Sequence, residues 1–523
     1  MNELLYNLGA KPHIPTYMKE ILLALFFFQV FISCEKEGVG TTELPYLQFY
    51  QAKISIPANV SGSADFVVQS NTDWELLVSS GSDWLQLSKS SGHGTDTIHV
   101  SVAGNVVAGQ PRTAIVTAKV ANASLNLKAE LTIEQKAFDV ELLSQKILAG
   151  KLTNYFNAIT ADPAGGFLCV GTNNFTGFPG IGFGDAWIVK CNNDGDTLWT
   201  RTMGNKTEDD AAKAVIPTSD GGFIVGATSF GYQRPGRSDW WIIKMQSNGD
   251  TAWTRVVGTP DYYEYLTSMV PASNGDFIVA GIKSTPVNNI QITKFDRNGN
   301  TIWDKYLDEF IGGNTRSMSV TPDGSIYVSL GTSGGDYGIV KLNANGEKIW
   351  SKVLGSNKGD DPLSIQSTAD GGCIVAGTSY GSENGDVTGK NHSSYTDLWI
   401  VKLDANGNMS WNKLLGGSSN DFYSSNAGIA LTPDGGYVFA AIAGVQDGDV
   451  GTNQQNGGTW LFKLNNSGQL LWSKAFASPN GNQANGLLMN SDGSFWVAGS
   501  VNSTATYPSD DHSDGWLMKF KEN

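Results

Sequence analysis

Aromatic side chains and carboxylates gather in the variable stretches of this 523-residue chain, between segments that repeat. The candidate binding residues share this placement: Tyr232, Arg234, Tyr262, Tyr263, Tyr265, Asp360, Asp361, Tyr395, Phe422 and Tyr423. Aromatic faces beside carboxylates suit sugar rings, which offer them C–H groups and hydroxyls. The alternative is a solvated surface with scattered tyrosines, because apolar atoms cover much of any protein surface. The pattern predicts a glycan site, with an idle loop surface as the open alternative.

The same stretches carry adjacent carboxylates, which can act as general acid and base in a glycan hydrolase or lyase. They are Asp209, Asp210, Asp360 and Asp361. No sequence spacing selects a catalytic pair among them. The histidines beyond the first 33 residues are widely spaced: His93, His99, His392 and His512. Such spacing does not fit a metal cluster or a catalytic triad, so we assign no catalytic residue, metal or cofactor.

Two similar insertions raise the question of calcium binding. They read Glu383-Asn-Gly-Asp-Val-Thr-Gly and Gln446-Asp-Gly-Asp-Val-Gly. Both lack the remaining acidic ligands of an EF-type loop, so the calcium signal is weak.

A repeated unit forms the scaffold that must position these residues. A turn with glycine recurs seven times, at Gly165, Gly221, Gly275, Gly324, Gly371, Gly435 and Gly493. Their spacing gives a period of about 47 to 64 residues, and such a period with several short strands is typical of a β-propeller. Tight turns such as 219–222 and 247–250 join the first strand to the second and the third to the fourth. Their Asp-Gly and Asn-Gly pairs supply the positive φ that two-residue hairpins require.

Counting these motifs closes the ring. A fourth-strand tryptophan occurs six times, at Trp199, Trp253, Trp303, Trp350, Trp411 and Trp472, against seven glycine turns. The last unit stops after its third strand, at Phe520, and residues 141–150 supply a candidate fourth strand. A blade shared between the termini leaves few exposed edges. We therefore predict a seven-bladed β-propeller over residues 140–523, closed by strand 141–150.

Residues that recur at one position in nearly every unit are expected to serve the fold. The third-strand tryptophans are Trp187, Trp241, Trp399, Trp460 and Trp516. We assign these and the fourth-strand tryptophans to packing between blades. A third-strand lysine also recurs, at Lys190, Lys244, Lys294, Lys341, Lys402, Lys463 and Lys519. We interpret these lysines as partners of acids on neighbouring strands or of solvent, in preference to a basic ring for anions.

The variable connections give the main indication of function. Both tight turns of each unit lie at one end of the propeller, so the variable connections lie at the other. Binding sites cluster on variable loops held by a rigid scaffold. The candidate residues are therefore expected at this loop end.

Residues 46–137 lack the repeat, and their sequence predicts a small Ig-like β-sandwich. Short alternating stretches are separated by Gly, Ser and Asn clusters, as in sandwiches. The order of landmarks is Asn71-Thr-Asp-Trp74, Ser82-Asp-Trp84-Leu85, Lys89-Ser-Ser-Gly92, Asn105, Pro111-Arg-Thr-Ala114 and Leu131-Thr-Ile-Glu-Gln135. This order resembles the BACON domain family, whose name implies carbohydrate binding, although many members look like spacers. Trp74 and Trp84 are assigned to the sandwich core, with a sugar-stacking platform as the alternative.

The first 33 residues read as an export signal, with Met1 or Met18 as the start. An apolar run from Ile21 to Ser33 is too short to anchor the chain as a membrane span. Phe31-Ile32-Ser33-Cys34 resembles a bacterial lipobox, apart from Phe31, and implies lipid on Cys34; a plain secretory signal is the alternative. The following Glu35-Lys36-Glu37 resembles the acidic export tag of Bacteroidetes surface lipoproteins. Residues 34–45 would be a tether, and the chain would face outwards on the outer membrane.

Composition excludes one class of partner. The net charge of −15 repels phosphate backbones, so we expect no nucleic acid partner. Cys169, Cys191 and Cys373 occupy apolar repeat positions and favour buried free thiols, although a disulfide between Cys169 and Cys191 is geometrically open.

The repeat resembles propeller units of bacterial secreted and surface proteins and brings no catalytic motif with it. The sequence reading is a monomeric surface lipoprotein whose loop end binds a glycan or a surface protein without turnover, with the sandwich as spacer. The alternatives are a glycan-active hydrolase or lyase using loop carboxylates, and a structural platform in an outer-membrane assembly.

Overall fold

The computed structural model describes residues 44–522 apart from short gaps, and the structural statements below refer to this part of the chain. The gaps are 57–60, 104–110, 138, 149–152, 175–183, 205–207, 232–236, 285–287, 382, 393–394, 422–427, 452–455, 478–481 and 503–512. The described part is all-β, with three short 3-10 helices: η1 (Ala123–Leu125), η2 (Ser273–Gly275) and η3 (Asp308–Phe310). No described helix has the length and apolarity to cross a membrane.

The N-terminal domain packs two sheets face to face. One sheet has the order β1 (Leu47–Phe49), β3 (Ser61–Ser70), β7 (Asp96–Ala103) and β5 (Leu85–Leu87). The other has the order β2 (Lys53–Ile56), β9 (Lys128–Gln135), β8 (Arg112–Val120), β4 (Asp73–Ser80) and β6 (Ser91–His93). All neighbours are antiparallel except β2 and β9, which are parallel. The alternation of apolar and polar residues along β2 and β4 turns one face of the sheet inwards.

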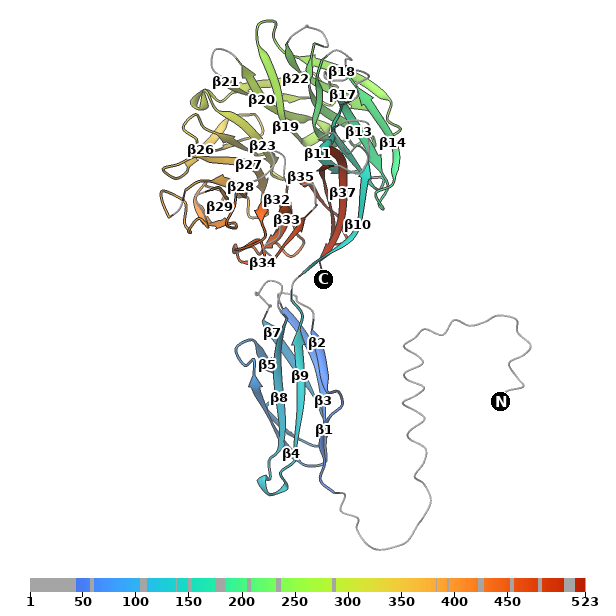
Figure 1. The fold of residues 1–523 in the computed structure, drawn as a ribbon, viewed down its shortest axis with the longest axis vertical. Helices are drawn as coiled ribbons and strands as arrows, with labels where there is room; N and C mark the ends of the chain where they lie inside the picture. The colour runs from blue at the N-terminus through green and yellow to red at the C-terminus, as the bar shows by residue number, and fades with distance from the viewer. Residues whose placement is uncertain are drawn as a thin grey trace, which may run out of the picture.

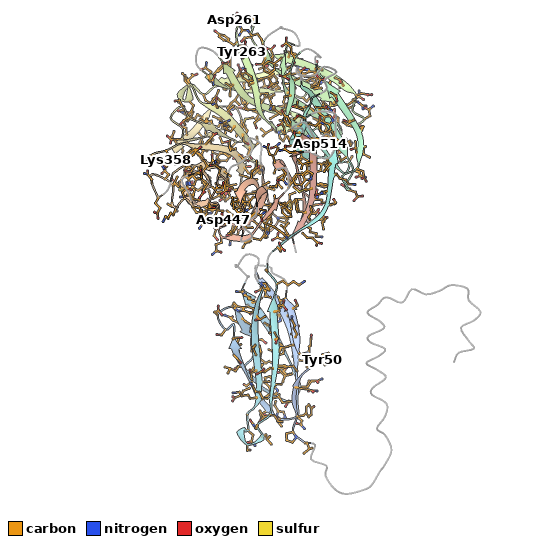
Figure 2. The ribbon with its side chains drawn as sticks, in the orientation of Figure 1. Tyr50, Asp261, Tyr263, Lys358, Asp447 and Asp514 are labelled. Carbon is orange, nitrogen blue, oxygen red and sulfur yellow. The ribbon has the colours of Figure 1, made fainter. Side chains whose placement is uncertain are left out.

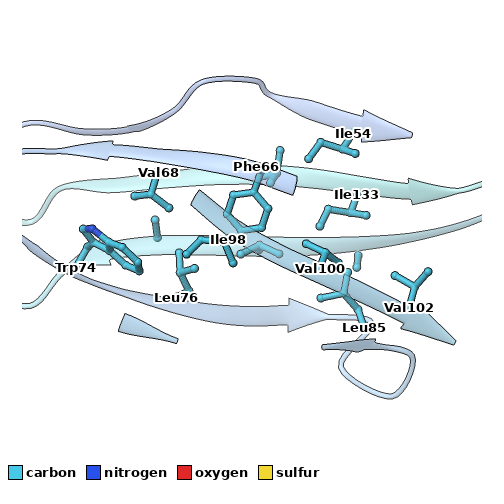
Figure 3. Packing of buried hydrophobic residues seen from close by; sticks show 14 of the residues in the cluster. Ile54, Phe66, Val68, Trp74, Leu76, Leu85, Ile98, Val100, Val102 and Ile133 are labelled. Atoms are coloured by element: carbon cyan, nitrogen blue, oxygen red, sulfur yellow. The ribbon is translucent and has the colours of Figure 1, made fainter. Parts of the chain in front are cut away.

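The sandwich core contains both tryptophans, as expected. Phe66, Ile98 and Ile133 are almost fully buried between the sheets (Figure 3). Trp74 is 1% exposed, and its Nε1 donates to the carbonyl of Gly94 at 2.8 Å. Trp84 is 7% exposed and belongs to the same core. Neither indole face is free to stack on a sugar.

The rest of the chain forms seven four-stranded antiparallel sheets, the blades of a propeller (Figure 1). Blade 1 is β11 (Asn154–Ala161), β12 (Phe167–Asn174), β13 (Gly184–Cys191) and β14 (Thr197–Met203). Blade 2 is β15 (Asp210–Pro217), β16 (Phe223–Phe230), β17 (Ser238–Met245) and β18 (Thr251–Val257). Blade 3 is β19 (Tyr263–Pro271), β20 (Phe277–Ser284), β21 (Asn288–Phe295) and β22 (Thr301–Tyr306). Blade 4 is β23 (Asn314–Val320), β24 (Ile326–Gly331), β25 (Tyr337–Leu342) and β26 (Lys348–Leu354).

The remaining three blades complete the ring. Blade 5 is β27 (Asp360–Ser367), β28 (Cys373–Ser379), β29 (Asp397–Leu403) and β30 (Met409–Leu415). Blade 6 is β31 (Ile429–Leu431), β32 (Tyr437–Val445), β33 (Asn456–Leu464) and β34 (Leu470–Ala477). Blade 7 is β35 (Asn482–Met489), β36 (Ser494–Asn502), β37 (Ser513–Glu522) and β10 (Val140–Leu148). The prediction of an all-β chain with a seven-bladed propeller is confirmed.

Blade 7 joins the two ends of the propeller. Its outer strand β10 pairs antiparallel with the C-terminal strand β37, with Val140 opposite Glu522 and Leu148 opposite Gly515 (Figure 1). The pairing covers the edge that β37 would otherwise expose. It also shows where the chain enters the ring, because Val140 lies at the same end of the blade as Glu522.

The hairpin turns differ in type from the sequence prediction. In the turn after β15, the N–H of Gly221 donates to Thr218 and the N–H of Thr218 donates to Gly222. Gly221 has a φ of +78°, whereas Asp220 is absent from the described residues with positive φ. These features describe a three-residue loop with one left-handed glycine, not a two-residue hairpin. The Asp220 side chain is then free to accept hydrogen bonds.

The propeller thus has two ends of different character. The turns between first and second strands and between third and fourth strands lie at one end, the turn face. The connections between second and third strands and between blades lie at the other end, the loop face. Val140 and Glu522 belong to the turn face, so the sandwich is attached at the end opposite the loop face.

Candidate functional site

The repeated lysines serve the turn face. Four of them lie 2.6 to 2.9 Å from an aspartate in the first turn of their own blade: Lys190 with Asp162, Lys244 with Asp220, Lys402 with Asp370 and Lys463 with Asp434. Lys294 lies 3.6 Å from Asp276. In these five blades a partner acid comes from the turn, and Lys463 in addition pairs with Glu522 of the neighbouring strand β37 at 2.6 Å.

The turn position lowers the pKa of its aspartate, as Asp220 shows. The Thr218 hydroxyl and, against partial burial, the Lys244 ammonium lower the pKa of Asp220 to about 2. Lys341 and Lys519 instead donate to backbone carbonyls of the next blade, Ala405 and Asn193. Each repeated lysine thus has a protein partner, and the structural interpretation of these residues holds.

The fourth-strand tryptophans link each blade to the next. Trp411 donates from Nε1 to the carbonyl of Asn466 at 3.1 Å, and Trp350 donates in the same way to Ala405. A methyl group added to Gly468 would lie only 2.9 Å from the Trp411 ring, so the turn needs glycine there. The third-strand tryptophans are fully or almost fully buried, as expected. Of the fourth-strand set only Trp472 is fully buried, because these strands form the outer edge of each blade.

Several predicted aromatic residues meet on the loop face between blades 2 and 3. Tyr263 and Tyr265 alternate along β19, and their rings lie parallel with centroids 6.4 Å apart. The Arg237 guanidinium lies 4.6 Å from the centre of the Tyr263 ring, and the Lys283 ammonium lies 5.3 Å from that of Tyr262. Tyr265 remains 37% exposed and also contacts the Phe230 ring, 6.2 Å away. We call Phe230, Arg237, Tyr262, Tyr263, Tyr265 and Lys283 the tyrosine patch.

The other predicted residues do not join this patch. Figure 2 shows Tyr263 on a different part of the ring from Lys358 and Asp447, which mark the loop face of blades 5 and 6. Tyr395, half exposed, lies in the connection before β29 in blade 5. Tyr232, Arg234, Phe422, Tyr423 and Cys34 lie outside the described residues.

Asp360 and Asp361 have separate structural partners. Arg316 of blade 4 holds Asp361 with two hydrogen bonds, Nε to Oδ1 at 3.1 Å and a terminal nitrogen to Oδ2 at 2.7 Å. Burial raises the pKa of Asp361, although Arg316 opposes the shift. Asp360 is buried and accepts from the N–H and hydroxyl of Ser356. Neighbours on one strand point to opposite faces, so these two carboxylates do not form an acid–base pair.

A loop-face pocket of about 260 Å³ surrounds the Arg316–Asp361 pair. Its lining includes Asn314, Thr332, Thr378 and Tyr380, whose ring is 50% exposed. The pocket offers hydroxyls, amides and one aromatic ring around a neutralised ion pair. This combination can hold a polar, uncharged ligand by hydrogen bonds.

Asp209 and Asp210 are likewise bound to the fold. Asp209 accepts from the N–H of Gly184 at 2.7 Å. Asp210 has no exposed surface. Asp210 is thus shielded from any ligand, whereas Asp209 is exposed and has one oxygen bound by Gly184.

A cluster of titratable groups lies between blades 5 and 6. His392 Nδ1 is 2.9 Å from Asp397 Oδ2, and its Nε2 is 3.5 Å from Asp449 Oδ2. Burial alone would lower the pKa of His392, but Asp397 and Asp449 raise it above the ordinary value. Burial raises the pKa of Asp421 to about 6, although its carboxylate accepts from the N–H groups of Gly417 and Gly444. We call His392, Asp397, Asp421 and Asp449 the proton cluster.

The two insertions with aspartate and glycine clamp neighbouring blades. Asp386 accepts from the N–H of Gly355 at 3.1 Å, and its own N–H donates to the Gly355 carbonyl. Asp449 makes the same two contacts with Gly416. Each insertion therefore covers the end of the outer strand in the preceding blade. Within the described ranges, no group of three or more His, Cys, Asp and Glu side chains can hold a metal ion.

The cysteines occupy the core. Cys169, Cys191 and Cys373 are buried free thiols, as expected. Burial raises the pKa of Cys191 to about 12, so its thiol stays protonated.

Sequence reasoning missed Arg316, Lys283 and the role of His392. Arg316 stands at a position of the first strand where the other blades carry other residue types, and this singularity was a usable signal. Nothing local connects His392 with Asp449, because they meet only when two blades pack.

Comparison with known proteins identifies the N-terminal domain. Residues 72–136 match the BACON family model, which is described as "Putative binding domain, N-terminal". The search of curated proteins found no match.

Two solved structures resemble the chain at low identity. A protein of unknown function from Bacteroides caccae is 13% identical, covers 59% of this chain and 98% of its own, and has a TM-score of 0.34. A protein of unknown function from Dyadobacter fermentans is 11% identical, covers 73% of this chain and 99% of its own, and has a TM-score of 0.41. At these values the likeness says nothing about a ligand. Residues 72–136 thus match the BACON family, and the chain joins this domain to a seven-bladed β-propeller.

Proposed function

We propose that this protein binds a glycan through the loop face of its propeller, without turning it over, at the surface of the cell. The observation that carries the proposal is the tyrosine patch. Tyr263 and Tyr265 present parallel, partly exposed rings, with the Arg237 guanidinium over Tyr263 and the Lys283 ammonium over the adjacent Tyr262. Sugar rings stack on such aromatic faces and use their hydroxyls to accept from neighbouring cations.

The position of the patch favours recognition. The chain enters the propeller at the turn face, where Val140 pairs with Glu522, and the tyrosines lie at the opposite end. A sandwich attached there acts as a spacer that leaves the loop face unobstructed. A partner protein presenting a polar surface is the alternative ligand.

A hydrolase or lyase has less support from the same geometry. Asp361 is engaged by Arg316, Asp360 by Ser356 and Asp209 by Gly184. General acid–base catalysis needs a carboxyl group within reach of the substrate. A structural platform in an outer-membrane assembly remains the third candidate.

A glycan array combined with a reducing-sugar assay separates the three functions. The protein would be produced as the full chain with Cys34→Ala, to avoid lipid in the assay. Binding without sugar release supports the proposal. Sugar release that Asp361→Asn abolishes supports the hydrolase, and silence in both assays supports the platform.

Anchoring through Cys34 is proposed from the sequence alone. The short apolar run that ends at Ser33 motivates it. Cells grown with a palmitate analogue should label the parent chain and leave Cys34→Ala unlabelled and outside the membrane fraction. Equal labelling of both chains would contradict lipid on Cys34.

A further inference from the structure

The inner strands of the propeller share an irregularity that points side chains toward its axis. In six of the seven, one residue bulges out of the pairing with the second strand: Asn157, Lys213, Thr267, Arg316, Leu363 and Asn485. A β-bulge re-aims side chains and recurs beside functional sites. All six residues line one cavity of about 210 Å³, together with Gly428 at the start of blade 6, so the cavity lies on the axis.

Most polar residues of this ring are engaged by the protein. The Asn157 side chain donates to the carbonyl of Ala212, and the Asn485 side chain donates to that of Phe156, each at 2.8 Å. Thr267 donates to the carbonyl of Ala280. These bonds tie adjacent strands together, which is a structural role.

The two cations of the ring differ in their partners. Arg316 has its charge matched by Asp361. Lys213 belongs to blade 2, whereas Asp361 belongs to blade 5. The Lys213 ammonium has no ion pair or hydrogen bond to any residue that the structure describes. Burial lowers the pKa of Lys213, and no neighbouring charge contributes to that shift.

The residues that line the cavity provide no negative charge to neutralise the Lys213 ammonium. The described residues around the cavity are Lys213 and Arg316 together with neutral side chains, among them Thr267, Ser268 and Ser317. A half-buried cation without a counter-charge is costly, and it attracts an anion more strongly than an exposed lysine does. Hydroxyls around it supply further donors to the same anion.

We propose that the axial cavity binds a carboxylate, with the Lys213 ammonium as its counter-ion. The charge of one unmatched lysine fits one carboxylate. The carboxylate belongs either to a free small acid or to an acidic sugar residue within a glycan. This site stands apart from the tyrosine patch and does not depend on it.

Arg316 lies between the axial cavity and the loop face. It lines the axial cavity and also the loop-face pocket that contains Asp361 and Tyr380. Its guanidinium is held by Asp361, so Lys213 is the cation of the axial cavity that is left for a ligand.

The test uses calorimetric titration of the full chain, as its Cys34→Ala form, at constant ionic strength. The probes are acetate, D-glucuronate, D-glucose and an oligomer of galacturonate. We expect glucuronate to bind and glucose not to bind. Tighter binding of the oligomer than of acetate would assign the carboxylate to a glycan, and the reverse would assign it to a free acid. No binding of any acid, or equal binding of glucose and glucuronate, would overturn the proposal.

Variants locate the site. Lys213→Met should weaken glucuronate binding by about tenfold or more, the usual effect of a lost charge-assisted hydrogen bond. Lys358→Met, which removes an exposed loop-face lysine, is the matched control and should bind as the parent does. Tyr263→Ala with Tyr265→Ala should also retain glucuronate binding, so failure of the tyrosine patch is distinguishable. Equal losses in Lys213→Met and Lys358→Met would contradict the axial site.

Thermal melting gives a second readout that does not need a folded variant. Glucuronate should raise the melting temperature of the parent chain more than glucose at the same concentration. Because Lys213 has no protein partner, Lys213→Met itself should melt at or above the parent temperature. A lower melting temperature for this variant, with no glucuronate effect on the parent, would assign Lys213 to the fold instead.

Discussion

The two ends of the propeller follow opposite rules. At the turn face one arrangement recurs around the ring: a third-strand lysine bound to a turn aspartate, as in Lys402 with Asp370, and a tryptophan bonded to the next turn, as in Trp411 with Asn466. At the loop face the blades share less: the insertions of blades 5 and 6 make the same contacts with Gly355 and Gly416, but other features stand alone. The tyrosine patch, the Arg316–Asp361 pocket and the proton cluster each occur at one place among the described residues.

Recurrence therefore distinguishes structural residues from recognition residues in this propeller. A residue that every blade keeps meets the same neighbours in each copy, so its contacts stabilise the ring. A residue that stands in one blade has no such role to repeat. Removing repeated residues should therefore change stability, and removing singular exposed residues should change binding.

The largest expected effect is on ring closure. Deleting residues 140–148 would strip β37 of its partner and expose an apolar edge between blades 6 and 7. We expect aggregation or loss of a cooperative thermal transition. Deleting residues 44–137 is the control, since it removes the sandwich and keeps β10, and it should leave propeller melting unchanged. A chain without β10 that melts like the parent would contradict this role.

The second largest effect is expected from the tryptophans, and it should differ between the third and the fourth strand of a blade. Trp399 is fully buried on β29, and its replacement by alanine should cost about 3–5 kcal/mol, as for other buried tryptophans. Trp411 on β30 is only partly buried, and its replacement by alanine should cost less than that of Trp399, because less of its surface leaves water on folding. Chemical denaturation of both variants measures the difference. Equal losses in the free energy of unfolding would contradict this difference, because they would show that the outer strand stabilises the blade as much as the buried strand does.

A smaller effect concerns pH and the proton cluster. The pKa of Asp421 rises from the ordinary 3.8 to about 6 in the folded chain, so folding favours its protonated form. Its contribution to stability is complete below about pH 4 and is lost as the pH rises through about 6. His392 acts in the same direction at higher pH, because its folded pKa is also raised.

Asp421→Asn removes this titration and keeps one oxygen, which can accept from Gly417 or from Gly444 but not from both, since these N–H groups donate to different oxygens of Asp421. The melting temperature of the parent should fall relative to that of the variant between about pH 4 and pH 6. Melting curves at matched ionic strength measure the trend. Parallel profiles for the two chains would contradict a raised pKa at Asp421.

Local patterns were enough to predict the scaffold. Glycine turns and tryptophans lie within one blade, so counting them predicted seven blades and a shared closing blade. The turn type was misread because the pair Asp220–Gly221 also suits a three-residue loop with only the glycine left-handed. The exposure of Trp411 followed from the blade edge, which sequence periodicity does not distinguish from an inner strand.

The candidate site was predictable only where it is local. Tyr263 and Tyr265 share a face because they alternate on one strand, which the sequence displays. Arg316 and Asp361 come from different blades and meet only through inter-blade packing. The β-bulge that turns the Lys213 side chain toward the axis could not be predicted either, because no residue type near it signals a bulge. Contacts of this kind need coordinates.

We propose that Tyr263 and Tyr265, which occur in one blade only, bind a glycan and contribute little to the stability of the fold. The most direct measurement is glycan-array binding, with melting temperature, for the parent, for Tyr263→Ala with Tyr265→Ala, and for Tyr50→Ala. Tyr50 is the matched control, an exposed tyrosine of the sandwich (Figure 2). The account predicts several-fold weaker binding in the double variant, at about 1 kcal/mol for each stacked ring, with melting nearly unchanged and Tyr50→Ala like the parent. Unchanged binding by the double variant, or a large fall in its melting temperature, would contradict it.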